Sequence, residues 1–154
     1  MKPNYWNVPL RHLLVALVLL ITSTSVMATD RVYTGFFNNK AVSGYDTVAY
    51  FTEGKPKKGS DRYTTKYMGA KWLFSSIENL ELFKANPKKY APQYGGYCAW
   101  AMAQGHTAKS DPKQWSIENG KLYLNYDASV KKKWLADKEE SIKKADQHWS
   151  AILK

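Results

Sequence analysis

Apolar and polar residues are distributed very differently in the first thirty residues and in the rest of the chain. An uninterrupted apolar block of nine residues, 13–21, follows a short basic start, and small residues follow it up to Ala28. The block lies within the roughly 7–15 residues of a secretory h-region and falls short of the roughly 20 that span a bilayer. The pattern predicts a signal peptide over residues 1–28, and therefore a periplasmic or secreted protein with no membrane span after cleavage.

Beyond the leader, apolar residues recur in short runs that are separated by turn residues. The runs that favour strands are 47–51, 62–67, 71–75, 115–118 and 121–124. The second and third of these runs predict a β-hairpin. The last two flank Asn119 and Gly120, which favour the positive φ angles of a type I′ turn, so they predict a second hairpin.

Capping residues and helical spacing predict the remaining elements. Ser75 with Glu78 three residues later has the arrangement of a capping box, and Asp127 is a typical N-cap residue. The predicted helices cover about 75–86, 87–90, 98–103 and 127–153, the last with a break near residue 137. Hairpins with interspersed helices and no βαβ alternation predict an α+β fold, in which small hairpins pack with short helices and a C-terminal helical segment.

Charge and cysteine content narrow the functional classes. Removing Lys2 and Arg11 with the leader would lower the formal net charge from +10 to +8 over a mature chain of 126 residues. A basic surface is typical of proteins that bind nucleic acid or anionic membranes. Export excludes nucleic acid, and the lysines are dispersed, so solvated faces are the favoured interpretation, with lipid headgroups or an exported protein partner as alternatives. The single cysteine excludes an intrachain disulfide.

Several segments are similar to one known family. They read GYDTVAYF at 44–51, YMGAKWLFSS at 67–76 and FKANPKKYAP at 83–92, with further likeness at 94–99 and 119–126. Together they resemble the exported branch of the YHS-domain family. The likeness covers about residues 41–126 and implies one YHS-type domain over residues 29–154 with a C-terminal helical extension. It also implies a framework role for five residues, which are Asp46, Tyr50, Trp72, Phe74 and Tyr90.

The resemblance also concerns a metal site. Metal-binding members of the family resemble a small treble-clef-like module, with one cysteine before the first strand and two more at the start of the helix. The matching positions here are Ser43, Ser75 and Asn79, and none of them carries a thiol. Hydroxyls and amides are poor ligands for Cu(I) or structural Zn(II), so the family's site is not carried over to these positions.

Cys98 is the side chain with the most distinctive reactivity. It follows Gly95 and Gly96 at a predicted helix N-terminus, where exposed N–H groups favour a thiolate. Met102 would share its helix face and His106 follows soon after, so the three are the candidate metal ligands, with copper as the candidate cofactor. The alternatives are that Cys98 is a buried core residue of a structural or protein-interaction domain, or that it acts in thiol redox chemistry with a partner thiol.

Asp46 and Asp111 are further candidates, because each lies beside a predicted turn or strand. A carboxylate in such a position can orient a ligand, but Asx-type bonds to turn amides are the favoured interpretation. No triad order, paired-carboxylate motif, phosphate loop or dinucleotide fingerprint is recognisable, so hydrolase, kinase and dehydrogenase functions have no support and no catalytic residue is predicted.

Overall fold

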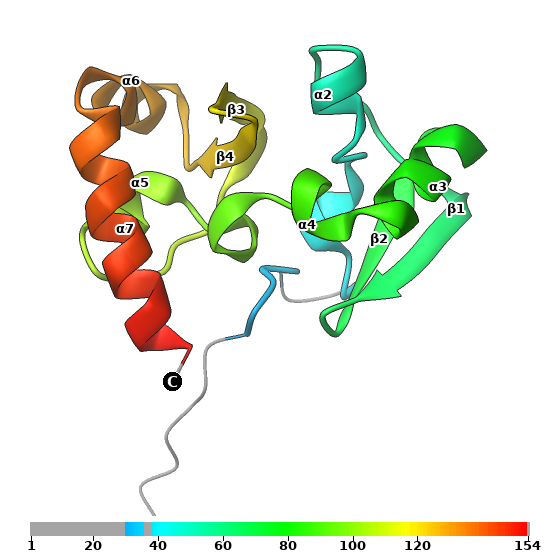
Figure 1. The fold of residues 1–154 in the computed structure, drawn as a ribbon, viewed down its shortest axis with the longest axis horizontal. Helices are drawn as coiled ribbons and strands as arrows, with labels where there is room; N and C mark the ends of the chain where they lie inside the picture. Colours follow the sequence, from blue (N-terminus) through cyan, green and yellow to red (C-terminus); the bar gives the residue numbers. More distant parts are fainter. Residues whose placement is uncertain (1–29, 36–37, 154) are drawn as a thin grey trace, which may run out of the picture.

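The computed structural model describes residues 30–35 and 38–153, so the predicted signal peptide lies outside the described residues. The described elements are η1 (Ala41–Gly44), α2 (Ala49–Thr52), β1 (Ser60–Tyr67), β2 (Ala70–Phe74), α3 (Ile77–Ala85), α4 (Pro87–Tyr90), η2 (Gln93–Gly96), α5 (Ala99–Ala103), β3 (Asp111–Glu118), β4 (Lys121–Asn125), α6 (Ala128–Ala136) and α7 (Lys138–Ile152). Two small antiparallel sheets among these helices confirm the predicted single-domain α+β fold (Figure 1). No helix in the described part is long and apolar enough to cross a membrane.

Turn chemistry determines both hairpins, and both were predicted. Strands β1 and β2 meet at Met68 and Gly69, which have φ angles of 48° and 80°. Strands β3 and β4 meet at Asn119 and Gly120, with φ angles of 50° and 72°. Positive φ at both central positions is the requirement of a type I′ turn, whose twist matches that of the flanking strands. The sequence therefore specifies the register of each hairpin.

The segment 47–51 was predicted as a strand, and this is wrong, because it leads into the short helix α2. Asp46 precedes the helix, and its Oδ1 accepts the backbone N–H groups of Val48 at 2.9 Å and Ala49 at 3.2 Å. These bonds satisfy amides that would otherwise lack a partner at the helix start. Local side-chain capping therefore overrides the β propensity of the run.

Helix α3 begins one residue later than predicted. Its N-cap is Ser76, whose hydroxyl accepts the backbone N–H of Asn79 at 3.1 Å, and not Ser75. The helix buries Leu80 and Phe83, and Asn86 then caps α4 by accepting the N–H of Lys89. Because Ser75 is not the N-cap, its side chain can form a hydrogen bond elsewhere in the fold.

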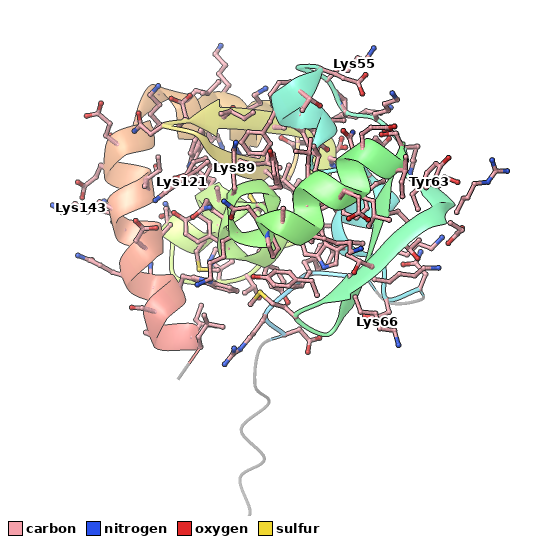
Figure 2. The ribbon with its side chains drawn as sticks, turned by 45° about the vertical axis from the view of Figure 1, so that its right-hand side comes forward. Lys55, Tyr63, Lys66, Lys89, Lys121 and Lys143 are labelled. Atoms are coloured by element: carbon pink, nitrogen blue, oxygen red, sulfur yellow. The ribbon has the colours of Figure 1, made fainter. Side chains whose placement is uncertain are left out.

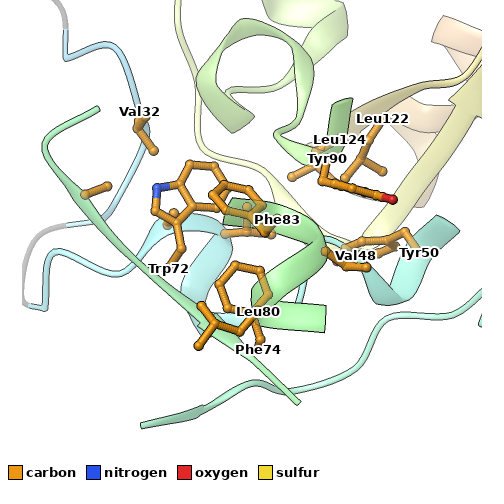
Figure 3. Close-up of a cluster of buried hydrophobic side chains, with 13 residues drawn as sticks. Val32, Val48, Tyr50, Trp72, Phe74, Leu80, Phe83, Tyr90, Leu122 and Leu124 are labelled. Carbon is orange, nitrogen blue, oxygen red and sulfur yellow. The ribbon is translucent and has the colours of Figure 1, made fainter. Parts of the chain in front are cut away.

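Strand β4 contributes side chains to two hydrophobic clusters, one on each of its faces. Leu122 and Leu124 pack into the first cluster, and Tyr123 between them packs into the second, as alternation along a strand requires. The first cluster is drawn in Figure 3 and is centred on Trp72 and Phe83, whose rings lie 4.9 Å apart. The second lies under α5, α6 and α7 and consists of Tyr94, Ala99, Met102, Ala103, Tyr123, Trp134 and Ala145.

The C-terminal helical segment is divided as predicted. Asp127 caps α6 by accepting the N–H of Val130 at 2.8 Å, and the chain breaks at Asp137, whose φ and ψ angles are −142° and 46°. Trp134 is fully buried and holds α6 against Tyr123. The two helices therefore cover α5 and the second hydrophobic cluster (Figure 1).

Candidate functional site

A buried carboxylate at Asp46 organises the half of the molecule that contains α2, β2 and α3. Asp46 is fully buried. Its Oδ1 caps α2, as described above, and its Oδ2 accepts the backbone N–H of Ser75 at 2.8 Å and the Ser75 hydroxyl at 2.7 Å. The side-chain amide of Asn79 donates to the same oxygen at 2.7 Å. Counting the Val48 and Ala49 amides, five donors serve this carboxylate, and a buried charge needs such a set to be tolerated.

The second candidate, Asp111, lies at the start of β3. Its Oδ1 accepts the N–H of Lys113 at 2.9 Å, an Asx-type bond two residues along the chain. The neighbouring Pro112 carbonyl accepts the Tyr50 hydroxyl at 2.8 Å. Burial raises the pKa of Tyr50 well above its ordinary value, so this hydroxyl keeps its proton and links α2 to β3.

Cys98 lies at the N-cap position of α5 and its side chain is in the protein interior. It is 1% exposed, and its Sγ lies 3.8 Å from Oδ1 of the buried Asn125, as a thiol donor to an amide acceptor. The same Asn125 oxygen accepts the N–H of Trp100 at 3.2 Å.

The other two candidate ligands lie in different environments. Met102 is fully buried one turn after Cys98, and its N–H donates to the Cys98 carbonyl at 3.0 Å. His106 is exposed beyond the end of α5. The structure therefore brings Cys98 and Met102 together on one buried turn and leaves His106 at the surface. Within residues 30–35 and 38–153, no group of three or more His, Cys, Asp or Glu residues is arranged to hold a metal ion.

Comparison with known families adds one finding. Residues 48–94 match the family model of the YHS domain. The chain contains a YHS domain. The match runs from the residue before α2, through the first hairpin and α3, to Tyr94 in η2, so it includes Ser75 and Asn79 and ends before Cys98. Comparisons with curated proteins and with solved structures found no match.

The Asp46 network joins Asp46, two residues before the matched segment, to Ser75 and Asn79 within it, which are two of the three positions that the resemblance pairs with cysteines. Ser75 Oγ and Asn79 Nδ2 lie 3.5 Å apart, and both reach Oδ2 of Asp46. Ser43, at the third position, is exposed in η1. The carboxylate thus joins the end of β2 to the first turn of α3.

Two long-range contacts, one in the Asp46 network and one between α7 and α5, were missed from the sequence. Ser75 was assigned to a helix cap and Asn79 was noted only as a missing thiol, although both serve Asp46. His148 of α7 was not placed at all, and its Nδ1 lies 3.0 Å from the carbonyl oxygen of Met102, 46 residues away in the chain. No local pattern signals such a contact. The partial signal for the first was the polar pair Ser75 and Asn79, which lie on either side of the α3 N-cap Ser76.

Proposed function

We propose that this protein is a non-catalytic binding module that acts outside the cytoplasm, and that its YHS domain is a scaffold that needs no metal ion. The observation that carries this proposal is the Asp46 carboxylate, which is fully buried and bound by five donors from α2, β2 and α3. A network whose members are all satisfied fixes the relative positions of the elements that contribute to it.

The ligand chemistry also supports a scaffold without metal. Ser75 and Asn79 offer a hydroxyl and an amide, which are poor ligands for Cu(I) and Zn(II), and both already donate to Asp46. Displacing these bonds would leave a buried carboxylate without its donors, at a cost of several kcal/mol. A metal ion would therefore have to bind elsewhere in the chain.

Copper binding at Cys98, Met102 and His106 stays a prediction. The positions of the three side chains indicate which rearrangement of the protein it would require. Cys98 is 1% exposed and bonded to Asn125, and Met102 is fully buried, whereas His106 is exposed. To bind one ion, α5 would have to open and bring its buried thiol and thioether toward the surface. Two buried ligands and one exposed imidazole are fewer than a closed structural metal site uses.

A metal titration separates the two hypotheses. The mature protein is purified without added metal, its metal content is measured, and Cu(I) and Zn(II) are titrated in competition with a chelator of known affinity. The scaffold hypothesis predicts less than stoichiometric metal and the same titration curve for wild type and Cys98→Ser. One equivalent of Cu(I) that binds to wild type and is lost in Cys98→Ser would overturn it in favour of the copper site.

The export proposal has its own test. The apolar block at residues 13–21 supports it, and intact-mass analysis of protein from fractionated cells checks it. The expected product is an extracytoplasmic chain that begins at Thr29 or within a few residues of it. A cytosolic product that retains Met1 would contradict the proposal.

A further inference from the structure

A pocket of about 240 Å³ lies where four parts of the fold meet. The N-terminal segment at residues 31–32, the β1–β2 turn and the segment from α4 to η2 line it, and the end of α7 closes another side. In Figure 1 the N-terminal segment, in blue, passes between the β1–β2 turn and the C-terminal end of α7. Its apolar and aromatic lining includes Tyr67, Met68, Trp72, Pro92, Trp149 and Leu153.

The charged residues that line the pocket all have the same sign. Among the residues that the structure describes, Arg31 and Lys88 line it and no acidic residue does. Both side chains belong to exposed residues, and among the described residues neither forms a salt bridge. Other surface lysines, such as Lys57 and Lys138, pair with glutamates. An apolar wall with two cations that pair with no described carboxylate complements a molecule with an apolar body and one anionic group.

The segment that carries Arg31 is fixed in place. The N–H of Tyr33 donates to the Gly95 carbonyl at 2.9 Å, and Val32 is 4% exposed in the first hydrophobic cluster. Gly95 has a φ of +60°, and a Cβ at this position would lie 2.0 Å from the Arg31 carbonyl oxygen. Only glycine permits this close approach, so the wall of the pocket that contains Arg31 is built into the fold.

We infer that this pocket binds a small amphipathic carboxylic acid, with its aromatic or short aliphatic body against Trp149, Met68 and Tyr67 and its carboxylate at Arg31 and Lys88. The inference rests on the proposed binding function and gives its ligand class. Arginine and lysine are the side chains that bind carboxylates through charge-assisted hydrogen bonds. The volume is below the roughly 300–1,000 Å³ of pockets for drug-sized ligands, so the ligand is a smaller molecule.

The test compares two probes that differ only in charge, 4-phenylbutyrate and the neutral 4-phenylbutanol. They are titrated into the metal-free mature protein with a chelator present, and binding is followed by backbone amide NMR shifts and by tryptophan fluorescence. We expect saturable binding of the acid, with shifts at Gln93 and Gly95, and affinity for the alcohol weaker by roughly tenfold. Arg31→Gln and Lys88→Gln should each weaken binding of the acid severalfold and leave binding of the alcohol unchanged.

Lys143→Gln is the matched control, because it removes the same charge from an exposed site on α7 that does not line the pocket (Figure 2). It should leave both affinities unchanged. The inference is overturned if the acid does not saturate at millimolar concentration, if acid and alcohol bind equally, or if Lys143→Gln weakens binding as much as Lys88→Gln. Failure of the metal-independent scaffold is a separate result, since Cu(I) bound through Cys98 would appear in the metal titration whether or not the acid binds.

Discussion

The side-chain amide of Asn79 donates to the Asp46 carboxylate over 2.7 Å, across 33 residues of chain and in a fully buried environment. The Ser75 hydroxyl approaches the same oxygen over the same distance. These contacts tie the first turn of α3 and the end of β2 to the segment that begins α2. Residues on both sides of α3's first turn and at the start of α2 are therefore connected through hydrogen bonds to one carboxylate, and this arrangement has measurable consequences.

Replacing that charge should destabilise the fold strongly. Asp46→Asn keeps the shape of the side chain but exchanges one acceptor oxygen for an NH₂ group, which would face donors from Ser75 and Asn79 or from α2. Leaving buried donors without an acceptor costs about 3 kcal/mol in the free energy of unfolding. Denaturant unfolding followed by circular dichroism measures this loss.

The matched control is Asp127→Asn, which makes the same chemical change at an exposed carboxylate that accepts one backbone N–H. Asparagine caps helices about as well as aspartate, so the free energy of unfolding should change by less than about 0.5 kcal/mol. Equal effects of the two substitutions would show that the buried network has no special contribution to stability.

Thiols placed in the network should create a metal site. Ser75 Oγ and Asn79 Nδ2 lie 3.5 Å apart beside Asp46, so Ser75→Cys with Asn79→Cys would offer two thiolates and a carboxylate to one ion. We expect the double variant to bind Cd(II) with thiolate-to-metal absorption, whereas wild type and each single variant should not show it at equal concentration. A double variant that binds Cd(II) no better than wild type would mean that side chains at these two positions cannot bind the same metal ion.

The thiol of Cys98 should react slowly in the native protein. Its side chain is 1% exposed and contacts Asn125. A disulfide reagent can therefore react with the thiol only when α5 opens locally or the whole protein unfolds. Labelling is expected to be at least a hundredfold slower in buffer than in denaturant, by the ratio of closed to open protein. Rapid stoichiometric labelling of the native protein would show an accessible thiol and would favour the copper or redox hypotheses.

Alkaline pH should unfold the protein through its buried tyrosines. Burial raises the pKa of Tyr123 from 10.0 to about 12, and burial also raises the pKa of Tyr50 and Tyr94. Because the folded state holds these protons more tightly than the unfolded state, the associated stability is fully present below pH 10 and is lost as the pH rises toward 12. Unfolding free energies measured between pH 8 and 12 should fall over that range.

Tyr123→Phe tests the assignment. It removes one titrating hydroxyl and keeps the ring that packs on Trp134 at 5.1 Å. Stability at neutral pH should change by less than about 1 kcal/mol, and the decline above pH 10 should become shallower than in wild type. An unchanged decline would assign the alkaline loss to other groups.

The parts of the fold predicted from sequence are those determined by local chemistry. The two hairpins follow from Met68-Gly69 and Asn119-Gly120, and the break in the C-terminal helices follows from Asp137. The predicted strand at 47–51 was wrong because Asp46 caps the start of α2 through two local bonds, and Asp46 is itself held there by three bonds from the distant Ser75 and Asn79. Residues that serve a long-range network are the ones a local pattern misreads.

For the candidate metal ligands too, the sequence predicted the local spacing but not the long-range environment. The spacing of Cys98 and Met102 correctly predicted one helical turn, and helical spacing is a local property. Whether that turn faces solvent depends on β4, α6 and α7, which cover it, and on Asn125, which bonds the thiol. The pocket forms where residues 31, 68, 88 and 149, from four separate segments, come together. No repeating pattern in the sequence indicates that these residues are neighbours.

The most direct test of the metal-independent scaffold is the free energy of unfolding of the purified mature protein, measured with a strong chelator and again with one equivalent of Cu(I) or Zn(II). A metal that binds only the folded state stabilises it by about 2.7 kcal/mol at a hundred times its dissociation constant. The buried Asp46 network predicts the same free energy under all three conditions. A loss of stability in chelator, or a gain of that size with either metal, would contradict it.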